Sequence, residues 1–183
     1  GEKLSNGAAA LGWKRLQDPH CGYAAGWFRK AIAWSESGGG DKIASGYAQA
    51  LRAVGLFNEA EDAAFRYAAR SPEARELYLN IGIEELTRRW PRVPMSEARI
   101  ARFSAVAAAD RSAKAAQALG WKRYMQAGCG YGGRWFELAA DWSSDRRGDA
   151  HLNEGYALTQ RAVGRLARAE ALAQPWIERA APM

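Results

Sequence analysis

One string that occurs twice constrains the fold of this chain more than any other feature. The segment Leu11–Phe28 reads LGWKRLQDPHCGYAAGWF, and the segment Leu119–Phe136 reads LGWKRYMQAGCGYGGRWF. Ten of the eighteen positions are identical at a constant offset of 119 − 11 = 108 residues. The shared residue types are Gly, Trp, Lys, Arg, Cys, Tyr and Phe rather than a catalytic set. The repetition therefore indicates a duplicated structural unit.

A shorter spacing recurs inside each copy. Gly12, which precedes a tryptophan, is followed after 34 residues by Gly46, which precedes a tyrosine. In the second copy, Gly120 is followed after 35 residues by Gly155 in the same way. A period of about 34 residues is typical of repeats that each contain two helices. The sequence thus predicts a series of helix pairs, three of which make up one 108-residue block.

The composition favours helices throughout. The chain has 183 residues, of which 48% are hydrophobic and 25% charged, as in an ordinary folded protein. Alanine is abundant, whereas the strand-forming residues Val, Ile and Thr are sparse. We therefore predict an all-α fold of ten helices in five antiparallel pairs. The expected helices span about 4–17, 23–36, 42–54, 57–70, 72–89, 96–109, 111–126, 131–143, 149–163 and 166–180.

Tryptophans recur near the middle of the second helix in each copy. Trp27, Phe28, Ala31 and Trp34 follow a helical spacing, and the same four residue types recur from position 135 to position 142. We interpret this face as the apolar surface that packs between neighbouring helix pairs. Trp34 and its equivalent Trp142 are accordingly predicted to be buried in the core, because an aromatic side chain buries a large apolar area.

The segment from Gly46 to Pro72 resembles a tetratricopeptide repeat. It has Gly55 at the turn, Ala60 in the second helix and a proline opening the next unit. The resemblance implies a superhelical solenoid of five helix pairs, in which each pair stacks on the next. We expect one solenoid domain over residues 1–183. Within it we expect residues 8–70 and 116–180 to be similar and residues 71–115 to form a divergent middle unit.

The residue pattern of the repeats also resembles that of the repeat segments in the bacterial cellulose synthase operon protein C family and in related exopolysaccharide-secretion subunits. The residues that carry this resemblance are Gly12-Trp13, Trp27-Phe28, Ala33-Trp34, Gly46-Tyr47, Gly55 and Ala60-Glu61. It implies a periplasmic scaffold within a polysaccharide synthesis and export complex. A generic cytoplasmic adaptor is the alternative.

A row of arginines and glutamines is predicted on the concave face, which the first helix of each pair lines in such a solenoid. Its members are Arg15, Gln49, Arg52, Arg123, Gln126 and Arg161. Guanidinium groups pair with carboxylates and phosphates, so this row predicts a site for an acidic protein or peptide partner. The alternative interpretation is that these arginines form weak surface ion pairs with glutamates of the next helix pair.

The sequence offers little support for catalysis. His20 and His151 have no neighbouring Cys or carboxylate at metal-ligand spacing, and the acidic pair Glu84-Glu85 points in two directions on a helix. We therefore expect no enzyme, no metal and no cofactor. Cys21 and Cys129 occupy equivalent places in separate repeats, so we expect no disulfide between them.

The sequence gives less support to nucleic acid, membrane or glycan as a partner. The net charge of +6 follows from 26 basic and 20 acidic residues, but no nucleic-acid-binding motif accompanies it. No run of 18 apolar residues occurs, so we expect no membrane insertion. Direct glycan binding is the second functional hypothesis. It requires that at least one of Trp34, Trp90, Trp142 or Trp176 is exposed for stacking on a sugar ring.

Overall fold

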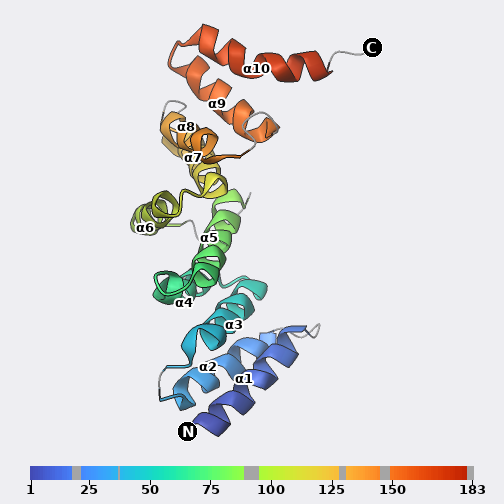
Figure 1. Ribbon diagram of the computed structural model, residues 1–183, viewed down its shortest axis with the longest axis vertical. Helices are drawn as coiled ribbons and strands as arrows, with labels where there is room; N and C mark the ends of the chain where they lie inside the picture. The colour runs from blue at the N-terminus through green and yellow to red at the C-terminus, as the bar shows by residue number, and fades with distance from the viewer. Residues whose placement is uncertain (18–21, 37, 89–94, 128–130, 145–148, 181–183) are drawn as a thin grey trace. The chain divides into compact units, whose positions relative to one another are not determined.

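The computed structural model describes residues 1–17, 22–36, 38–88, 95–127, 131–144 and 149–180. Ten α-helices and no strands occur in these ranges (Figure 1), which confirms the all-α prediction. The helix ends lie within two residues of the predicted positions. The helices are α1 (Glu2–Gln17), α2 (Gly22–Trp34), α3 (Gly40–Ala53), α4 (Phe57–Ala68), α5 (Pro72–Thr87), α6 (Glu97–Ala109), α7 (Ala113–Ala127), α8 (Gly133–Trp142), α9 (Ala150–Ala162) and α10 (Leu166–Ala180).

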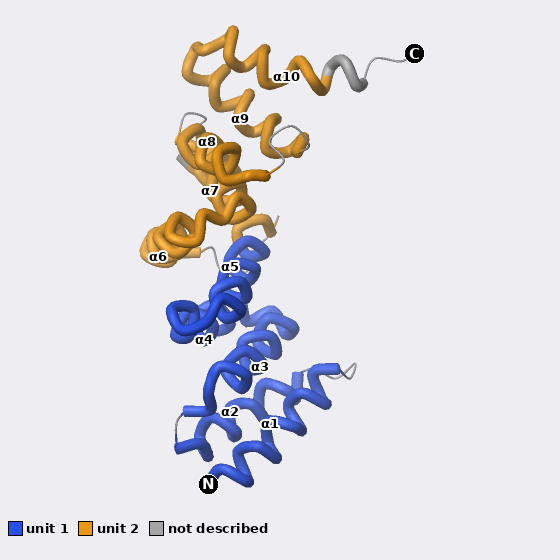
Figure 2. Tube along the Cα trace, viewed as in Figure 1, with its two compact units in different colours: residues 1–85 blue, residues 86–183 orange. Residues whose placement is uncertain are grey.

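Two compact units make up the chain (Figure 2). The N-terminal unit comprises residues 1–85, and the C-terminal unit comprises residues 86–183, so the division falls inside α5. In the N-terminal unit, α1 packs against α2, α2 against α3, and α3 against α4. In the C-terminal unit, the same holds for α6 to α10. Sequence neighbours are therefore spatial neighbours within each unit, as in helical repeats.

The helix-reversing turns of the two units are built alike. Gly55 and Gly164 have φ values of 80° and 78°, a left-handed conformation that glycine adopts without steric cost. After α3, the N–H of Leu56 donates to the carbonyl of Leu51 at 3.0 Å. After α9, the N–H of Arg165 donates to the carbonyl of Gln160 at 2.9 Å. These bonds satisfy the last carbonyls of each helix and turn the chain into the next one.

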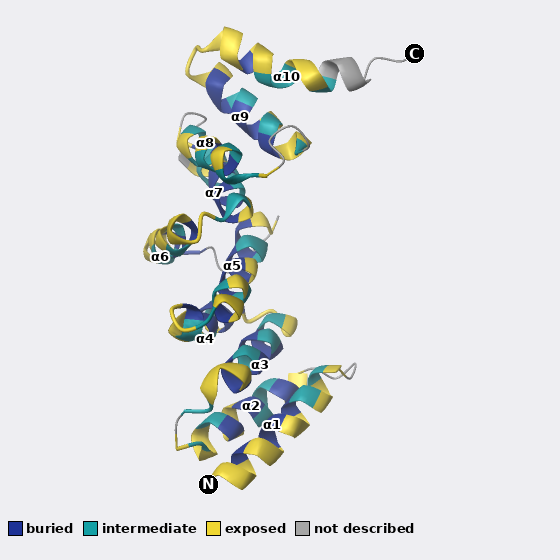
Figure 3. Ribbon diagram, in the orientation of Figure 1, coloured by how far each residue is buried: buried dark blue, intermediate teal, exposed yellow. Residues whose placement is uncertain are grey.

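A phenylalanine ring forms the centre of each repeated segment. Phe28 and Phe136 are completely buried in their core clusters. Figure 3 shows that buried positions occur along the helices of both units. Trp13 meets the Phe28 ring edge-on with centroids 5.2 Å apart, and Trp121 meets the Phe136 ring edge-on at 5.3 Å. The repeated string thus encodes the same aromatic pair in both units.

The predicted burial of Trp34 is wrong. Its side chain is 42% exposed, and its equivalent Trp142 is half-buried at the edge of the C-terminal core. The reason lies in the helical period of 3.6 residues. Trp27 and Trp34 are seven positions apart and share one stripe of the helix, whereas Phe28 lies about 100° further round. The core-facing stripe therefore contains Phe28 and Ala31, and the tryptophans flank it.

Several sequence-based predictions lie outside the described residues. They concern His20, Cys21, Trp90 and Cys129. Of the helices that the structure describes, none combines the length and the hydropathy needed to cross a membrane.

Candidate functional site

The predicted arginine and glutamine row is split between the two units, and much of it is engaged within the chain. In the N-terminal unit, Arg15 is exposed on α1, and Gln49 donates to the Ser45 hydroxyl at 3.2 Å. The Nε of Arg52 donates to Glu84 Oε2 at 2.5 Å, which connects α3 to α5. Arg52 thus contributes to packing within its own unit.

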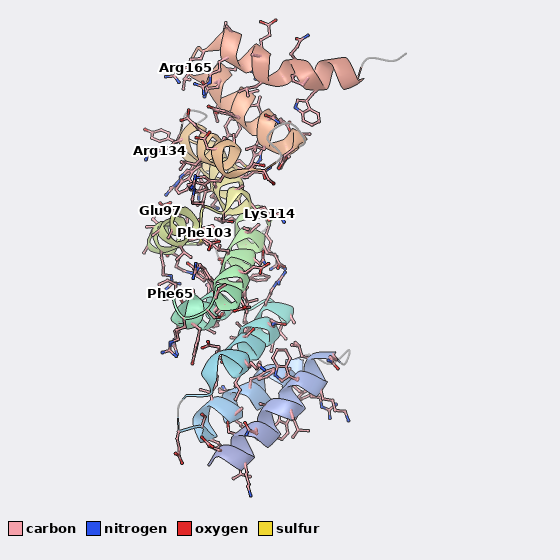
Figure 4. All side chains as sticks on the ribbon, in the orientation of Figure 1. Phe65, Glu97, Phe103, Lys114, Arg134 and Arg165 are labelled. Carbon is pink, nitrogen blue, oxygen red and sulfur yellow. The ribbon has the colours of Figure 1, made fainter. Side chains whose placement is uncertain are left out.

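The three members in the C-terminal unit differ from one another. Arg123 on α7 forms a two-pronged ion pair with Glu97 on α6, with N–O distances of 3.1 and 2.8 Å (Figure 4 labels Glu97). The hydrogen bond from Arg123 is the main reason why the pKa of Glu97 is lowered. Gln126 and Arg161 are exposed. Arg123 therefore matches the ion-pair interpretation, and Arg161 is the arginine that lies in a groove.

That groove, the α9–α10 groove, lies between α9 and α10 and has a volume of about 730 Å³. Its apolar lining comes from Ala157, Leu158, Leu166, Ala169, Ala173 and Trp176. Arg161 lies in it together with the carboxylates of Glu154 and Glu170. Leu166 is 64% exposed, whereas the residue at its equivalent position in the N-terminal unit, Phe57, is 7% exposed.

The same face exists in the N-terminal unit, where it is buried. Gly46 corresponds to Gly155, which gives an offset of 155 − 46 = 109 residues for this part of the repeat. With this offset, Ala157 corresponds to Ala48, which is 0% exposed. Leu166 corresponds to Phe57 at 7%, and Ala173 corresponds to Ala64 at 3%.

In the N-terminal unit, α5 contacts both α3 and α4, the two helices that carry these buried residues. The ring of Tyr78 lies 5.4 Å from that of Phe65 on α4, and Glu84 pairs with Arg52 on α3. Near the start of α5, the Nε of Arg75 donates to the carbonyl of Ala68 at 3.2 Å. One repeat thus shows the face covered by a helix, and the other shows it open in the part of the chain that is described.

A second concave site, the α8–α9 cleft, is polar and has a volume of about 520 Å³. Its polar lining comes from Arg134, Glu137, Asp141, Thr159, Gln160 and Arg165, of which Figure 4 labels Arg134 and Arg165. Gln160 is only 5% exposed, and its Oε1 has no hydrogen-bond partner among the described residues. Its equivalent in the N-terminal unit is the buried Leu51.

Two exposed tyrosines also recur. Tyr23 and Tyr131 occupy equivalent positions of the repeated string and are 70% and 72% exposed. Packing does not explain why an aromatic ring is retained where solvent surrounds it. The sequence analysis did not select these tyrosines, although their recurrence at the 108-residue offset was the available signal.

The described residues contain no ready-made metal site. No group of three or more His, Cys, Asp or Glu side chains that could hold a metal ion occurs there. His151 stacks on Trp121 with ring centroids 4.5 Å apart, and its Nδ1 lies 3.5 Å from Glu154 Oε2. The imidazole is therefore engaged by neighbouring groups of the C-terminal unit.

Comparison of the chain with protein-family models, with curated proteins and with solved structures gave no match. The features that bear on function are the α9–α10 groove, the α8–α9 cleft and the differences in burial between the two units. Of the groove residues, the sequence singled out Arg161 and Trp176, whereas the alanines and leucines stand out only through the difference in burial between the two copies.

Proposed function

We propose that the chain is a non-enzymatic scaffold of the tetratricopeptide type, with five antiparallel helix pairs stacked as a solenoid, and that it holds a partner protein in the α9–α10 groove. The observation that carries the proposal is the open apolar face of α9 and α10. Equivalent residues of the N-terminal unit are buried, whereas Leu166 is 64% exposed. A concave, mostly apolar surface with a few polar groups is typical of binding sites.

The chemistry of the groove favours a protein over a small charged ligand. Alanine and leucine side chains dominate the surface, and Arg161 is its basic group. A partner with an apolar stripe and a carboxylate would match both features. The partner is still expected to carry a carboxylate, but this group would bind at Arg161 rather than along the whole predicted row.

The resemblance to exopolysaccharide-secretion scaffolds supports a periplasmic setting, in which the chain would help to assemble a cellulose or exopolysaccharide synthesis and export complex. A generic cytoplasmic adaptor remains the alternative setting. Fractionation of cells that produce the whole gene product separates the two settings, because the groove would serve a partner in either.

A photo-crosslinking amino acid at position 158 tests the scaffold function in the cells that naturally express the chain. Leu158 lines the groove and is half-buried, so a bulky replacement is tolerated there. The matched control carries the same crosslinker at Lys114, an exposed position on α7. We expect a protein adduct from position 158 that is absent from position 114. Equal or absent labelling at both positions would refute the scaffold proposal.

Direct glycan binding is the second candidate, because Tyr23 and Tyr131 are exposed at equivalent places and the α8–α9 cleft contains Gln160 with an unpartnered acceptor. Tyrosine rings stack on flat apolar faces, and sugar hydroxyls donate hydrogen bonds. Titration with β-1,4-linked gluco-oligosaccharides should release heat that decreases in the Tyr131→Ala variant. The absence of any binding heat would exclude this candidate.

A further inference from the structure

We propose that the occupant of the α9–α10 groove is an amphipathic α-helix of α5-like chemistry, with an apolar stripe and a glutamate that pairs with Arg161. This inference rests on the scaffold function proposed above and specifies the partner surface. It is carried by the internal duplication, because the N-terminal unit shows what covers the same face in this chain.

The apolar part of the match is direct. In the N-terminal unit, Ala48 and Ala64 are buried where α5 lies against α3 and α4. Their equivalents Ala157 and Ala173 are only partly buried and line the groove. Small side chains on both helices allow a third helix to approach closely. The groove therefore has the shape and the residue types that receive a helix in the N-terminal unit.

The charged part of the match pairs Arg161 with a glutamate of the incoming helix, and the groove also holds the carboxylates of Glu154 and Glu170. Arg52 pairs with Glu84 of α5 in the N-terminal unit. Arg161 is its equivalent at the offset of 109 residues, lines the open groove and is exposed. A glutamate at the Glu84 position of an incoming helix would meet Arg161. The segment from Ser71 to Arg88 has four glutamates and two arginines, hence a net charge of 2 − 4 = −2, in keeping with an acidic partner.

The order of the repeats argues for this helix over a second copy of the chain. Within the sequence, the α3–α4 pair is followed by α5, and the α1-type string returns only after α6, at α7. An α1-type helix, on which Leu4 and Leu11 are exposed, therefore does not directly follow an α3–α4-type pair in the repeat order. An α5-like helix is the element that matches the groove in the repeat order.

A peptide with the sequence of residues 71–88 is the probe, used with an acetylated N-terminus, an amidated C-terminus and a fluorescent label. Its binding to the full chain is measured by fluorescence anisotropy at low ionic strength, where ion pairs are least screened. The chain's own α5 is tethered beside α3 and α4, so its high effective concentration prevents the peptide from replacing it. We expect saturable binding to the full chain.

Two groove variants and one control locate the site. Arg161→Glu removes the attraction and adds a repulsion, and Ala157→Glu places a charge in the apolar base. Each should weaken binding at least about tenfold, which corresponds to about 1.4 kcal/mol. Lys114→Glu changes the net charge as much as Arg161→Glu does, but at an exposed site on α7, and should leave binding unchanged. The far-ultraviolet circular dichroism of each variant checks that its helices are intact.

A charge swap gives the decisive result. A peptide with Glu84→Arg should bind the unaltered chain weakly and the Arg161→Glu variant well, because the pair is restored with reversed signs. Absence of peptide binding, binding insensitive to both groove variants, or failure of the swap would each overturn the inference. So would a concentration-dependent dimer in sedimentation that Ala157→Glu abolishes, since a second copy would then occupy the groove. A protein adduct from position 158 without peptide binding would refute only this inference and leave the scaffold function standing.

Discussion

The ring of Phe28 lies against the backbone of Gly46, so closely that a Cβ atom on this glycine would stand 2.4 Å from two carbons of the ring. Gly155 stands in the same relation to Phe136, also at 2.4 Å. A separation below 3 Å is a steric clash, and the position therefore requires glycine in both units. The repeated glycine–aromatic pattern is thus explained by the approach of two helices over a buried phenylalanine ring.

We predict that Gly46→Ala destabilises the chain by about 1–3 kcal/mol, because the added methyl group overpacks the Phe28 site. The expected sign is opposite to that of helix propensity, since alanine is intrinsically the better helix former. Urea denaturation followed by circular dichroism measures the change. An unchanged or higher midpoint would show that the ring yields at little cost.

Gly7 provides the matched control for this substitution. It lies inside α1, and a Cβ atom added there has nothing within 4 Å. Gly7→Ala should therefore stabilise the chain by about 0.5–1 kcal/mol through propensity alone. A double variant of Gly46→Ala with Phe28→Leu should cost less than the sum of the two single changes, because the smaller side chain makes room for the methyl group.

The sequence predicted the helices well because local signals determine them. The turn glycines Gly55 and Gly164 recur at the ends of predicted helices, and the period of 34 or 35 residues spaces the helix pairs. The burial of individual aromatic residues was harder to predict. Trp34 and Phe28 lie on the same helix. Phe28 faces the core because glycines of neighbouring helices leave room for its ring, and the pattern of one helix alone does not contain this information.

The candidate site was predicted less well for a related reason. Charged residues at expected concave positions were selected, but Arg52 and Arg123 pair with Glu84 and Glu97 inside their own units. Only tertiary structure reveals such partners, because the paired residues lie 32 and 26 positions apart. The open face of α9 and α10 is equally invisible in one copy and becomes evident when the burial of both copies is compared.

Arg111 has a left-handed conformation after α6, with φ at 50°, as the glycines Gly55 and Gly164 have after α3 and α9. The hydrogen bonding is the same, since the N–H of Ser112 donates to the carbonyl of Ala107 at 3.0 Å. A side chain in this conformation costs about 1 kcal/mol, so Arg111→Gly should raise the free energy of unfolding by about 0.5–1 kcal/mol. Thermal unfolding measures the gain, and the reciprocal change Gly164→Ala should lower the melting temperature. A loss of stability in the Arg111→Gly variant would contradict this account.

The Glu97–Arg123 pair makes stability depend on pH in the acidic range. The pKa of Glu97 is lowered from its ordinary value of 4.5, first by the hydrogen bond from Arg123 and further by the charges of Arg123 and Lys122, while desolvation opposes the shift. A carboxylate whose pKa is lower in the folded state stabilises the fold above its unfolded pKa. This contribution disappears as the pH falls through the lowered folded pKa.

We therefore expect the Arg123→Gln variant to be less stable than the unaltered chain near neutral pH and to approach it as the pH falls through the lowered pKa of Glu97. Carbon-detected NMR titration should show the Glu97 pKa returning toward 4.5 in the variant. The exposed pair Arg168 and Glu137, with an N–O distance of 3.3 Å, serves as a comparison, and Arg168→Gln should leave the titration of Glu97 unchanged. An unshifted Glu97 in the unaltered chain would refute the role given to this hydrogen bond.

Substitution of Gln160 tests whether the α8–α9 cleft contains a polar group that lowers the free energy of unfolding but serves binding. Its buried Oε1 lacks a partner among the described residues, and the equivalent position of the N-terminal unit holds Leu51. Because a buried polar group without a hydrogen bond is costly, Gln160→Leu should raise the free energy of unfolding by about 1–2 kcal/mol, and Leu51→Gln should lower it by a similar or larger amount. Urea denaturation measures both. If glycans bind in the cleft, the Gln160→Leu variant should also lose the heat of oligosaccharide binding. A lower free energy of unfolding in this variant would instead show that the amide forms stabilising hydrogen bonds in the unaltered chain.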